Sequence, residues 1–346
     1  TTPSEFGNQQ HEPHIERIAP SMEVGFKHFP AFEKAGIKQI INGHFTFAPD
    51  GNPLVSPVKG MTNYWVACAV MAGFSQGGGV GLSLANWIVN GDPGLDVWAM
   101  DVSRFGDYAS MQFTNARVRE NYARRFSIRY PNEELQAARP LLTTPIYDKQ
   151  KAAGAQFGAA YGLEIPLWYA PKNTSDVFSW RRSTDFDHVG AEARAVRESV
   201  GLSDISGFAK YRVRGPGAAD WLDHILACRL PAVGRMVLAP MLKDDGKIIG
   251  DFSLSRLDDD SFLIIGSGIA ESYHMRWFLG HLPDTSDVEI NSLGLDLFGL
   301  TLAGPKSRDV LQSCVSVDIS QDSMRFMAVK QIDIGMIPAI VGRVSY

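Results

Sequence analysis

The sequence predicts a multidomain protein of mixed α+β and α/β class. Its 346 residues correspond to two or three domains at about 150 residues each. The first part contains an apolar run, a glycine-rich segment and a helical pattern in succession, whereas the second part contains alternating strand patterns enclosed by helical ones. Because 45% of the residues are hydrophobic, the chain can bury a large core without disulfides or metals.

The N-terminal region carries a helical pattern, a strand pattern and a turn. Apolar side chains recur at steps of three and four residues within 22–32, as in an amphipathic helix, and residues 37–41 have the apolar character of a strand. Pro49-Asp50-Gly51 predicts a tight turn, because proline fixes φ and the glycine can adopt a positive φ.

A glycine-rich segment follows a short apolar run. Residues 64–70 predict a strand buried on both faces, which places Cys68 in the core. Residues 73–81 contain five glycines, and residues 82–89 have helical spacing, so we expect a strand, a glycine loop and a helix. Such a loop presents N–H groups at the helix N-terminus to an anion or an electron-rich ring edge. A plain packing turn is the alternative, and the glycine spacing differs from that of a dinucleotide-binding fingerprint.

Residues 94–180 are rich in arginine and aromatic side chains and are typical of a connector, whose topology the sequence leaves open. Within this segment, residues 117–129 have a helical pattern with a basic side. The arginines of this pattern could hold acidic groups, although a solvated helix face is the simpler interpretation; they are Arg117, Arg119, Arg124, Arg125 and Arg129.

From Trp180 onward the pattern is that of an α+β domain. Helices are expected at 189–200, 218–226 and 270–279. Strands are expected at 209–213, 236–242, 248–256, 262–266 and 288–291. The turn Asp244-Asp245-Gly246 predicts a hairpin between the second and third of these strands.

Composition argues against several classes of protein. A net charge of −5 without a run of Lys or Arg indicates no nucleic-acid partner. No apolar stretch reaches about 18 residues, so we expect no membrane insertion. Three widely spaced cysteines indicate a reducing compartment and argue against disulfides and zinc sites. His11 and His14 flank a proline and are more simply a surface segment than a metal pair, so no metal is expected.

Motifs of the first part occur in one order: Pro49-Asp50-Gly51-x-Pro53, Asn63-Tyr64-Trp65-Val66-Ala67, Gly73, Gly77 to Gly81, Leu84-Ala85-x-Trp87-Ile88 and Gly91-x-Pro93. This order resembles the C-terminal end of the FAD-binding domain of dimethylglycine and sarcosine dehydrogenases. The resemblance implies that a cofactor-binding set lies near the flavin: Pro49, Asp50 and Gly51 in a turn, and Gly77, Gly78, Gly79 and Val80 at the pyrimidine edge, where the helix dipole would stabilise negative charge on the reduced ring.

Two further features concern this half. His44 lies beside the turn and could face a substrate, although a hydrogen-bonded structural histidine is the simpler interpretation. The dinucleotide-binding G-x-G-x-x-G motif and the flavin-attachment histidine of the resembled family lie upstream of these motifs and are not in the sequence. We therefore expect that the chain is a segment of a longer protein.

Motifs of the second part are Val200-Gly201-Leu202-Ser203-Asp204-Ile205-Ser206-x-Phe208-x-Lys210, Gly215-Pro216-x-Ala218, Gly234, Met241-Leu242-x-x-x-Gly246-x-Ile248-x-x-Asp251 and Leu302-Ala303-Gly304-Pro305-x-Ser307-Arg308-x-Val310-Leu311. They resemble the aminomethyltransferase, or T-protein, module. The resemblance implies that Phe208 and Asp251 contact tetrahydrofolate and that Asp251 is the catalytic carboxylate, which manages a proton during one-carbon transfer. A solvated strand aspartate before Phe252 is the alternative interpretation. Ser255 stands where simple T-proteins carry a tyrosine, and the family's T-G-E-x-G-Y glutamate would follow Tyr346.

The resemblances imply three domains: the C-terminal part of an FAD-dependent oxidoreductase domain at 1–95, a connector at 96–180, and the N-terminal part of a folate-binding domain at 181–346. The implied function is FAD-dependent oxidative demethylation of an N-methyl amino acid, of the dimethylglycine or sarcosine type, with transfer of the one-carbon unit to tetrahydrofolate. A standalone folate-dependent aminomethyltransferase or demethylase and a non-catalytic folate-binding module are the alternatives.

The implied cofactors are FAD and tetrahydrofolate. The implied partners are the N-methyl amino acid and an electron acceptor, which would be a carrier flavoprotein or oxygen. The implied location is the cytoplasm of a bacterium or the mitochondrial matrix. The sequence leaves open which N-methyl amine reacts, whether the flavin is covalently bound, and the oligomeric state.

Overall fold

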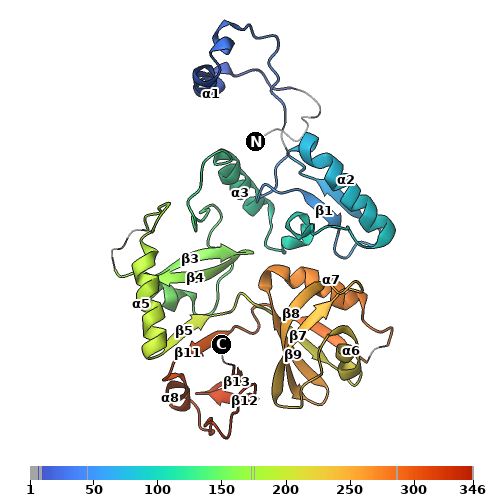
Figure 1. Cartoon of the computed structure of the whole chain (residues 1–346), viewed down its shortest axis with the longest axis vertical. Coiled ribbons are helices and arrows are strands. Elements are labelled where there is room, and N and C mark those ends of the chain that lie inside the picture. Colours follow the sequence, from blue (N-terminus) through green and yellow to red (C-terminus); the bar gives the residue numbers. More distant parts are fainter. Residues whose placement is uncertain are drawn as a thin grey trace.

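The structure is a computed structural model that describes residues 7, 10–44, 46–172, 174, 176–285 and 287–344. An N-terminal helical arm, formed by α1 (Ile15–His28) and η1 (Pro30–Lys34), extends from the body of the molecule (Figure 1). None of the residues of these two helices is buried. The strand expected at 37–41 is wrong: these residues are irregular. No described strand lies beside them to complete a hydrogen-bonded ladder, and a strand without a partner is unstable.

A small two-stranded ribbon and a long helix follow the arm. Strands β1 (Leu54–Pro57) and β2 (Trp65–Cys68) are antiparallel and lie against α2 (Gly73–Asn90). The strand expected over 64–70 is confirmed in its centre, but its burial on both faces is wrong. Helix α2 contacts both strands, whereas the first two short helices of the connector pack against β1, so β2 stays partly exposed and Cys68 is a free, exposed thiol rather than a core residue.

The expected glycine loop is also wrong. Helix α2 begins at Gly73, so Gly77, Gly78 and Gly79 lie within the helix. Each glycine costs about 1 kcal/mol relative to alanine in a helix. The helix forms because tertiary contacts outweigh this cost: Val80 is buried, and the Trp87 ring meets that of Trp65 with 5.8 Å between centroids.

The connector consists of short helices and one hairpin. Its elements are η2 (Trp98–Met100), η3 (Val102–Arg104), α3 (Met111–Ala123), α4 (Tyr147–Ala152), β3 (Ala155–Ala160) and β4 (Leu163–Tyr169). Helix α5 (Asp185–Glu198) follows the connector. Helix α3 ends at Ala123, earlier than the helix expected over 117–129. The β3–β4 hairpin turns through Tyr161 and Gly162, both with positive φ, the conformation that two-residue hairpin loops require.

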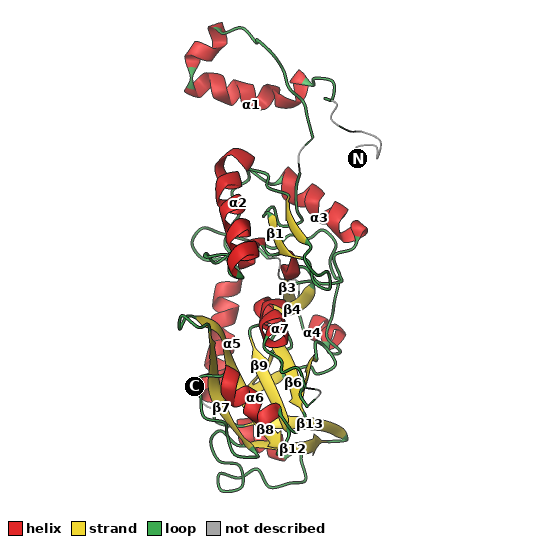
Figure 2. Ribbon diagram, turned by 90° about the vertical axis from the view of Figure 1, so that its right-hand side faces the viewer, coloured by secondary structure: helices red, strands yellow, loops and turns green. Residues whose placement is uncertain are grey.

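The second part of the chain is built on a five-stranded antiparallel sheet of order β10-β6-β9-β8-β7 (Figures 1 and 2). Its strands are β6 (Ala209–Arg214), β7 (Arg235–Leu242), β8 (Ile248–Asp258), β9 (Ser261–Gly266) and β10 (Glu289–Ser292), and all five were expected. Helices α6 (Ala218–Ile225) and α7 (Glu271–Gly280) cover one face, where the main hydrophobic core contains Tyr211, Phe252 and Phe278.

The other face of this sheet meets a smaller hairpin. Strands β12 (Val329–Ile334) and β13 (Ile337–Gly342) contribute Val329 and Ile340 to a second core with Met236, Leu257 and Leu263. Beside them, β5 (Gly201–Asp204) pairs with β11 (Leu300–Ala303), and α8 (Ser307–Gln312) follows β11. Because side chains alternate along a strand, Asp251 of β8 belongs to the face opposite the main core.

Candidate functional site

Phe208 and Asp251 lie at the same end of the main sheet. Phe208 precedes Ala209, the first residue of β6, which pairs with Gly266 of β9. On the other side of β9, the carbonyl oxygen of Asp251 lies 3.7 Å from the position that a Cβ would take at Gly266. The sheet therefore brings to one end the two residues that the motifs assigned to one cofactor.

Asp251 presents a free carboxylate. Its neighbour Phe252 is 1% exposed in the main core, whereas Asp251 itself is exposed. Among the residues that the structure describes, none makes a hydrogen bond or an ion pair with this carboxylate. A carboxylate with unused lone pairs, held at a strand position, can accept hydrogen bonds from the N–H groups of a ligand.

A buried lysine fixes the turn that carries Phe208. Lys210 Nζ donates to the carbonyl oxygens of Ser206 at 2.9 Å and Phe208 at 2.7 Å, and the Asp204 carboxylate accepts the N–H of Ser206 at 2.8 Å. Burial lowers the pKa of the Lys210 ammonium group. Both the Lys210 ammonium group and the Asp204 carboxylate therefore fix the turn, and Phe208 is 49% exposed at the end of the sheet.

Two glycines allow the backbone to approach closely here, and the sequence analysis did not single them out. A Cβ at Gly268 would lie 1.8 Å from the carbonyl oxygen of Gly207, and a Cβ at Gly266 would lie 2.5 Å from the Phe252 ring. The available signal was the Gly-Ser-Gly sequence at the end of a predicted strand, because glycine in a strand often marks close approach of another backbone.

The turn Pro49-Asp50-Gly51 forms as predicted, but its carboxylate is engaged. Gly51 has a φ of 80°, and its N–H donates to the Ala48 carbonyl. The Arg104 guanidinium donates from Nε and Nη2 to the two oxygens of Asp50, at 2.7 and 2.9 Å. Asp50 therefore stabilises the turn, and its assignment to a flavin site stays a prediction.

The glycines assigned to the flavin lie inside α2, and their N–H groups are not at its N-terminus, which residues 73–76 form. At Gly77, Gly78 and Gly79 an added Cβ would meet no described atom within 4 Å, whereas Val80 is buried. The three glycines thus present bare helix backbone at the surface, and a role toward flavin stays a prediction for all four residues.

The arginines of the connector bind locally. Arg117 Nη1 donates to the Leu135 carbonyl at 2.8 Å, and Arg129 Nη2 donates to Asn121 Oδ1 at 2.8 Å. Arg124 forms an ion pair with Glu133, which lowers the pKa of that carboxyl group, chiefly through the hydrogen bond. The interpretation as a solvated helix face is wrong for Arg117 and Arg124, which are partly buried and stabilise the connector, whereas Arg129 is exposed.

Other candidate chemistry is sparse. Within the described part of the chain, no group of three His, Cys, Asp or Glu side chains could hold a metal ion. The His44 ring lies in edge contact with that of His11, at 5.1 Å between centroids.

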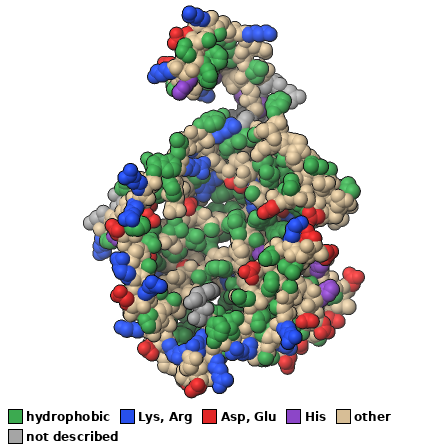
Figure 3. All heavy atoms as spheres, viewed as in Figure 1, with side chains coloured by type: hydrophobic (Ala, Val, Ile, Leu, Met, Phe, Trp, Pro, Cys, Tyr) green, Lys and Arg blue, Asp and Glu red, His purple; other side chains and the backbone are tan. Residues whose placement is uncertain are grey.

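Two general features concern the helices and the surface of the described residues. No helix among the described residues is long and apolar enough to cross a membrane. Figure 3 shows basic and acidic side chains interspersed over the visible face.

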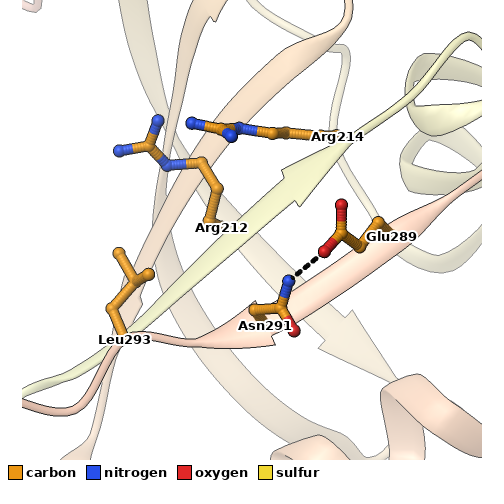
Figure 4. Close-up of a pocket in the computed structure, with 5 residues that line it drawn as sticks. All are labelled: Arg212, Arg214, Glu289, Asn291 and Leu293. Carbon is orange, nitrogen blue, oxygen red and sulfur yellow. Dashed lines mark hydrogen bonds between the residues drawn. The ribbon is translucent and has the colours of Figure 1, made fainter. Parts of the chain in front are cut away.

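Two small hollows lie at the other end of β6. Both are lined by Arg212 and Arg214, which project from the same face of the strand (Figure 4), and they measure about 170 and 330 Å³. Burial, followed by the nearby Arg214, lowers the pKa of Arg212, and its Nε is buried without a hydrogen-bond partner in the described structure. Neither Phe208 nor Asp251 lines these hollows.

Comparisons with known proteins agree with this architecture. Residues 146–346 match the family described as GCVT N-terminal domain, and residues 90–144 match the FAD dependent oxidoreductase central domain. The mitochondrial dimethylglycine dehydrogenase of Mus musculus is 35% identical over 99% of this chain and 40% of its own length. These matches confirm the pairing of modules, and the mixed α/β and α+β class, that the motifs predict.

Two further relatives differ in their named activities. The 4-methylaminobutanoate oxidase (formaldehyde-forming) of Paenarthrobacter nicotinovorans is 30% identical over 99% of this chain and 42% of its own length. The mitochondrial sarcosine dehydrogenase of Mus musculus is 27% identical over 88% of this chain and 38% of its own length. The chain thus spans about two fifths of the length of these relatives.

Proposed function

The chain belongs to the family of the GCVT N-terminal domain, and on this premise we propose that it is part of an FAD-dependent oxidoreductase that demethylates an N-methyl amino acid and transfers the one-carbon unit to tetrahydrofolate. One observation carries the folate half of the proposal: the free carboxylate of Asp251 and the exposed ring of Phe208 occupy one end of the main sheet. The named activities of the relatives support the oxidoreductase half.

The residues at the end of the sheet fit a folate. A pterin-type ring offers N–H donors at its edge and a flat face. The Asp251 carboxylate can accept from such donors, and the Phe208 ring offers a surface for stacking. When bound, tetrahydrofolate supplies the two nitrogens that receive the one-carbon unit as a methylene. Phe208 and Asp251 would hold the cofactor.

Asp251 would have two roles toward the bound cofactor. As a carboxylate it would orient the ring by accepting a hydrogen bond, and as a base it would accept a proton from the nitrogen that gains the one-carbon unit. Its exposed position gives a path for that proton to reach solvent. Phe208, held by Lys210, would restrict the position of the ring without taking part in proton transfer.

Replacing Asp251 tests the folate half. In the full-length protein, Asp251→Asn should weaken tetrahydrofolate binding by about tenfold or more, because a hydrogen bond to a charged group contributes about 1.5–3 kcal/mol. Isothermal titration measures the affinity. Asp258→Asn is the matched control, since Asp258 lies at the far end of the same strand and is exposed. Equal affinity in Asp251→Asn and wild type would refute the assignment.

The described residues do not by themselves make a flavin site, because Asp50 is bound to Arg104 and residues 77–80 lie inside α2. The flavin half is supported by the family match over residues 90–144 and by the relatives. A flavin absorbance spectrum of the full-length protein tests it, and a folded but colourless protein would favour the standalone transferase or the non-catalytic module.

The finer parts of the proposal follow the relatives. The substrate would be dimethylglycine, sarcosine or a similar N-methylated amino acid, and the electron acceptor a carrier flavoprotein or oxygen. The location would be the mitochondrial matrix or a bacterial cytoplasm; the names of the Mus musculus relatives call those proteins mitochondrial. Anaerobic reduction of the flavin by each candidate amine would identify the substrate.

A further inference from the structure

A chain of charged contacts connects the turn at residues 49–51 with helix α7. From it we infer that Arg276 is a positioning residue that holds the flavin-side turn and the folate-side sheet in a fixed relation. The expected consequence, more efficient transfer of a one-carbon unit between two sites, rests on the proposed function. The contacts themselves are independent of any ligand.

Arg276 crosses between the two matched regions of the chain. Its Nη1 and Nη2 donate to the two carboxylate oxygens of Asp101 at 2.7 and 3.0 Å, and Nη2 also donates to Ser103 Oγ at 2.8 Å. Asp101 is 1% exposed, so this bidentate pair is largely shielded from water on one side. Arginine is suited to such a contact because its planar fork matches a carboxylate.

The network continues from Asp101 to the turn. The carbonyl oxygen of Asp101 accepts Arg104 Nη1 at 2.9 Å. Arg104, 7% exposed, in turn binds both oxygens of Asp50 and the carbonyl oxygen of Asn52. The ion pairs Arg276–Asp101 and Arg104–Asp50 are thus connected through η3.

The opposite face of α7 is attached to the strands that carry the folate candidates. Tyr211 of β6 hydrogen-bonds His274, whose Nε2 lies 3.2 Å from the carbonyl oxygen of Ile249 in β8. Just before α7, Gly268 of η4 (Gly268–Ala270) packs against Gly207, next to Phe208. Helix α7 is therefore fixed to β6, β8 and the Phe208 turn, and Arg276 fixes it to the connector.

Three more contacts bring the same surfaces together. The Arg276 guanidinium lies 5.3 Å from the ring centroid of Trp87 in α2, and the rings of Tyr273 and Trp98 lie 5.5 Å apart. Lys243, after β7, forms an ion pair with Asp92, after α2. Figure 1 shows α7 directly below the segment that contains β1 and the short connector helices. Arg276 lies at the centre of this interface because it contacts both α2 and η3.

A fixed relation between two sites matters for a reactive one-carbon intermediate. A second site at constant distance raises the effective concentration of the acceptor and limits escape of formaldehyde. Loss of the Arg276 contact would leave Asp101 buried without its partner and would release α7 from η3. The expected effect is on transfer between the sites rather than on the oxidation itself.

The test uses the full-length, flavin-loaded protein with Arg276→Met, Arg276→Lys and, as a control distant from the interface, Arg308→Met. Amide hydrogen exchange is measured at Gly51 and Asn52, and free formaldehyde is measured per flavin reduced at saturating tetrahydrofolate. Arg276→Met should raise both at least threefold, with anaerobic flavin reduction within twofold of wild type. Arg276→Lys should give intermediate values, and Arg308→Met should change neither.

The two readouts separate this inference from the proposed function. Unchanged exchange at Gly51 and Asn52 in a folded Arg276→Met protein overturns the positioning role, as does a rise of equal size in Arg308→Met. If wild type itself releases every one-carbon unit as formaldehyde, the proposed transfer to folate fails, and the exchange measurement alone decides about Arg276. If Arg276→Met does not fold, the same comparison is made with Arg276→Lys.

Discussion

At the residue scale, His274 illustrates how one buried side chain joins three elements. The carbonyl oxygen of Ile249 can only accept a hydrogen bond, so His274 Nε2 carries the hydrogen and Nδ1 accepts from the hydroxyl of Tyr211. The ring is 2% exposed and lies 4.8 Å from the Phe252 ring, centroid to centroid. Burial lowers the pKa of His274 to about 4, despite the opposing effect of the Ile249 hydrogen bond.

This pKa predicts an acid-sensitive domain. The pKa of His274 is lower in the folded state than the ordinary value of 6.5, so its full stabilising contribution is present above pH 6.5 and is lost as the pH falls toward 4. The loss amounts to about 3 kcal/mol at pH 4. Urea unfolding of wild type and His274→Phe at pH 7, 5.5 and 4 measures it.

The comparison with His274→Phe cancels the titration of carboxylates common to both proteins. The free-energy difference between the two should shift by about 3 kcal/mol from pH 7 to pH 4, in favour of the variant. A difference that is constant across this range would mean that His274 does not titrate in the way its burial indicates.

At the element scale, α2 shows where local patterns mislead. Clustered glycines indicate a loop when each residue is considered by its own helix propensity. The helix nevertheless runs from Gly73 to Asn90, because Val80 and Trp87 anchor it to the ribbon. Its glycines leave a strip of backbone without side chains, which suits close approach of another group.

The substitution Gly78→Ala distinguishes an effect on helix propensity from an effect on the close approach of flavin to the α2 backbone. Propensity alone predicts that alanine stabilises α2 by about 1 kcal/mol, since a Cβ at Gly78 meets no described atom within 4 Å. If flavin lies against this backbone, the same change lowers the flavin content of the full-length protein. We expect both effects, measured by thermal unfolding and by flavin absorbance.

Gly25→Ala provides the matched change, because Gly25 lies inside α1 and also has no described atom within 4 Å of its Cβ position. It should leave the flavin content unaltered. Full flavin content in Gly78→Ala would mean that α2 is not part of the flavin site and that its glycines serve packing.

At the scale of the whole molecule, the sequence predicts elements better than their assembly. The five strands of the main sheet were predictable because each carries a short apolar run or an alternation of apolar and polar residues between turn residues. The proximity of Phe208 and Asp251 followed from motif resemblance and not from spacing. The pair Asp101–Arg276 was not predictable, because its members are 175 residues apart and leave no local pattern. The same holds for the engaged carboxylate of Asp50, whose partner Arg104 lies 54 residues away.

The interface between the modules contains one shielded and one exposed ion pair, which should differ in strength. Lys243 and Asp92 have side chains that are 26% and 47% exposed, and exposed pairs contribute about 0–1 kcal/mol. Asp92→Asn should therefore lower the thermal midpoint by less than about 4 °C. The difference from wild type should disappear at 1 M salt, because salt screens exposed charges. Asp284 is an exposed carboxylate elsewhere in the chain, and Asp284→Asn should leave the thermal midpoint unchanged at both low and high salt.

The stabilisation by the pair Lys243–Asp92 should be lost at low pH. The hydrogen bond from Lys243 lowers the pKa of Asp92 below its usual 3.8, so the contribution is present above that value and is lost as the pH falls below it. Wild type and Asp92→Asn should therefore converge below pH 3.8 but differ at pH 7. If Asp92→Asn lowered the thermal midpoint at pH 7 by as much as Arg276→Met, Asp92 would contribute as much to the interface as Arg276. Shielding from water would then not determine which ion pair stabilises the interface.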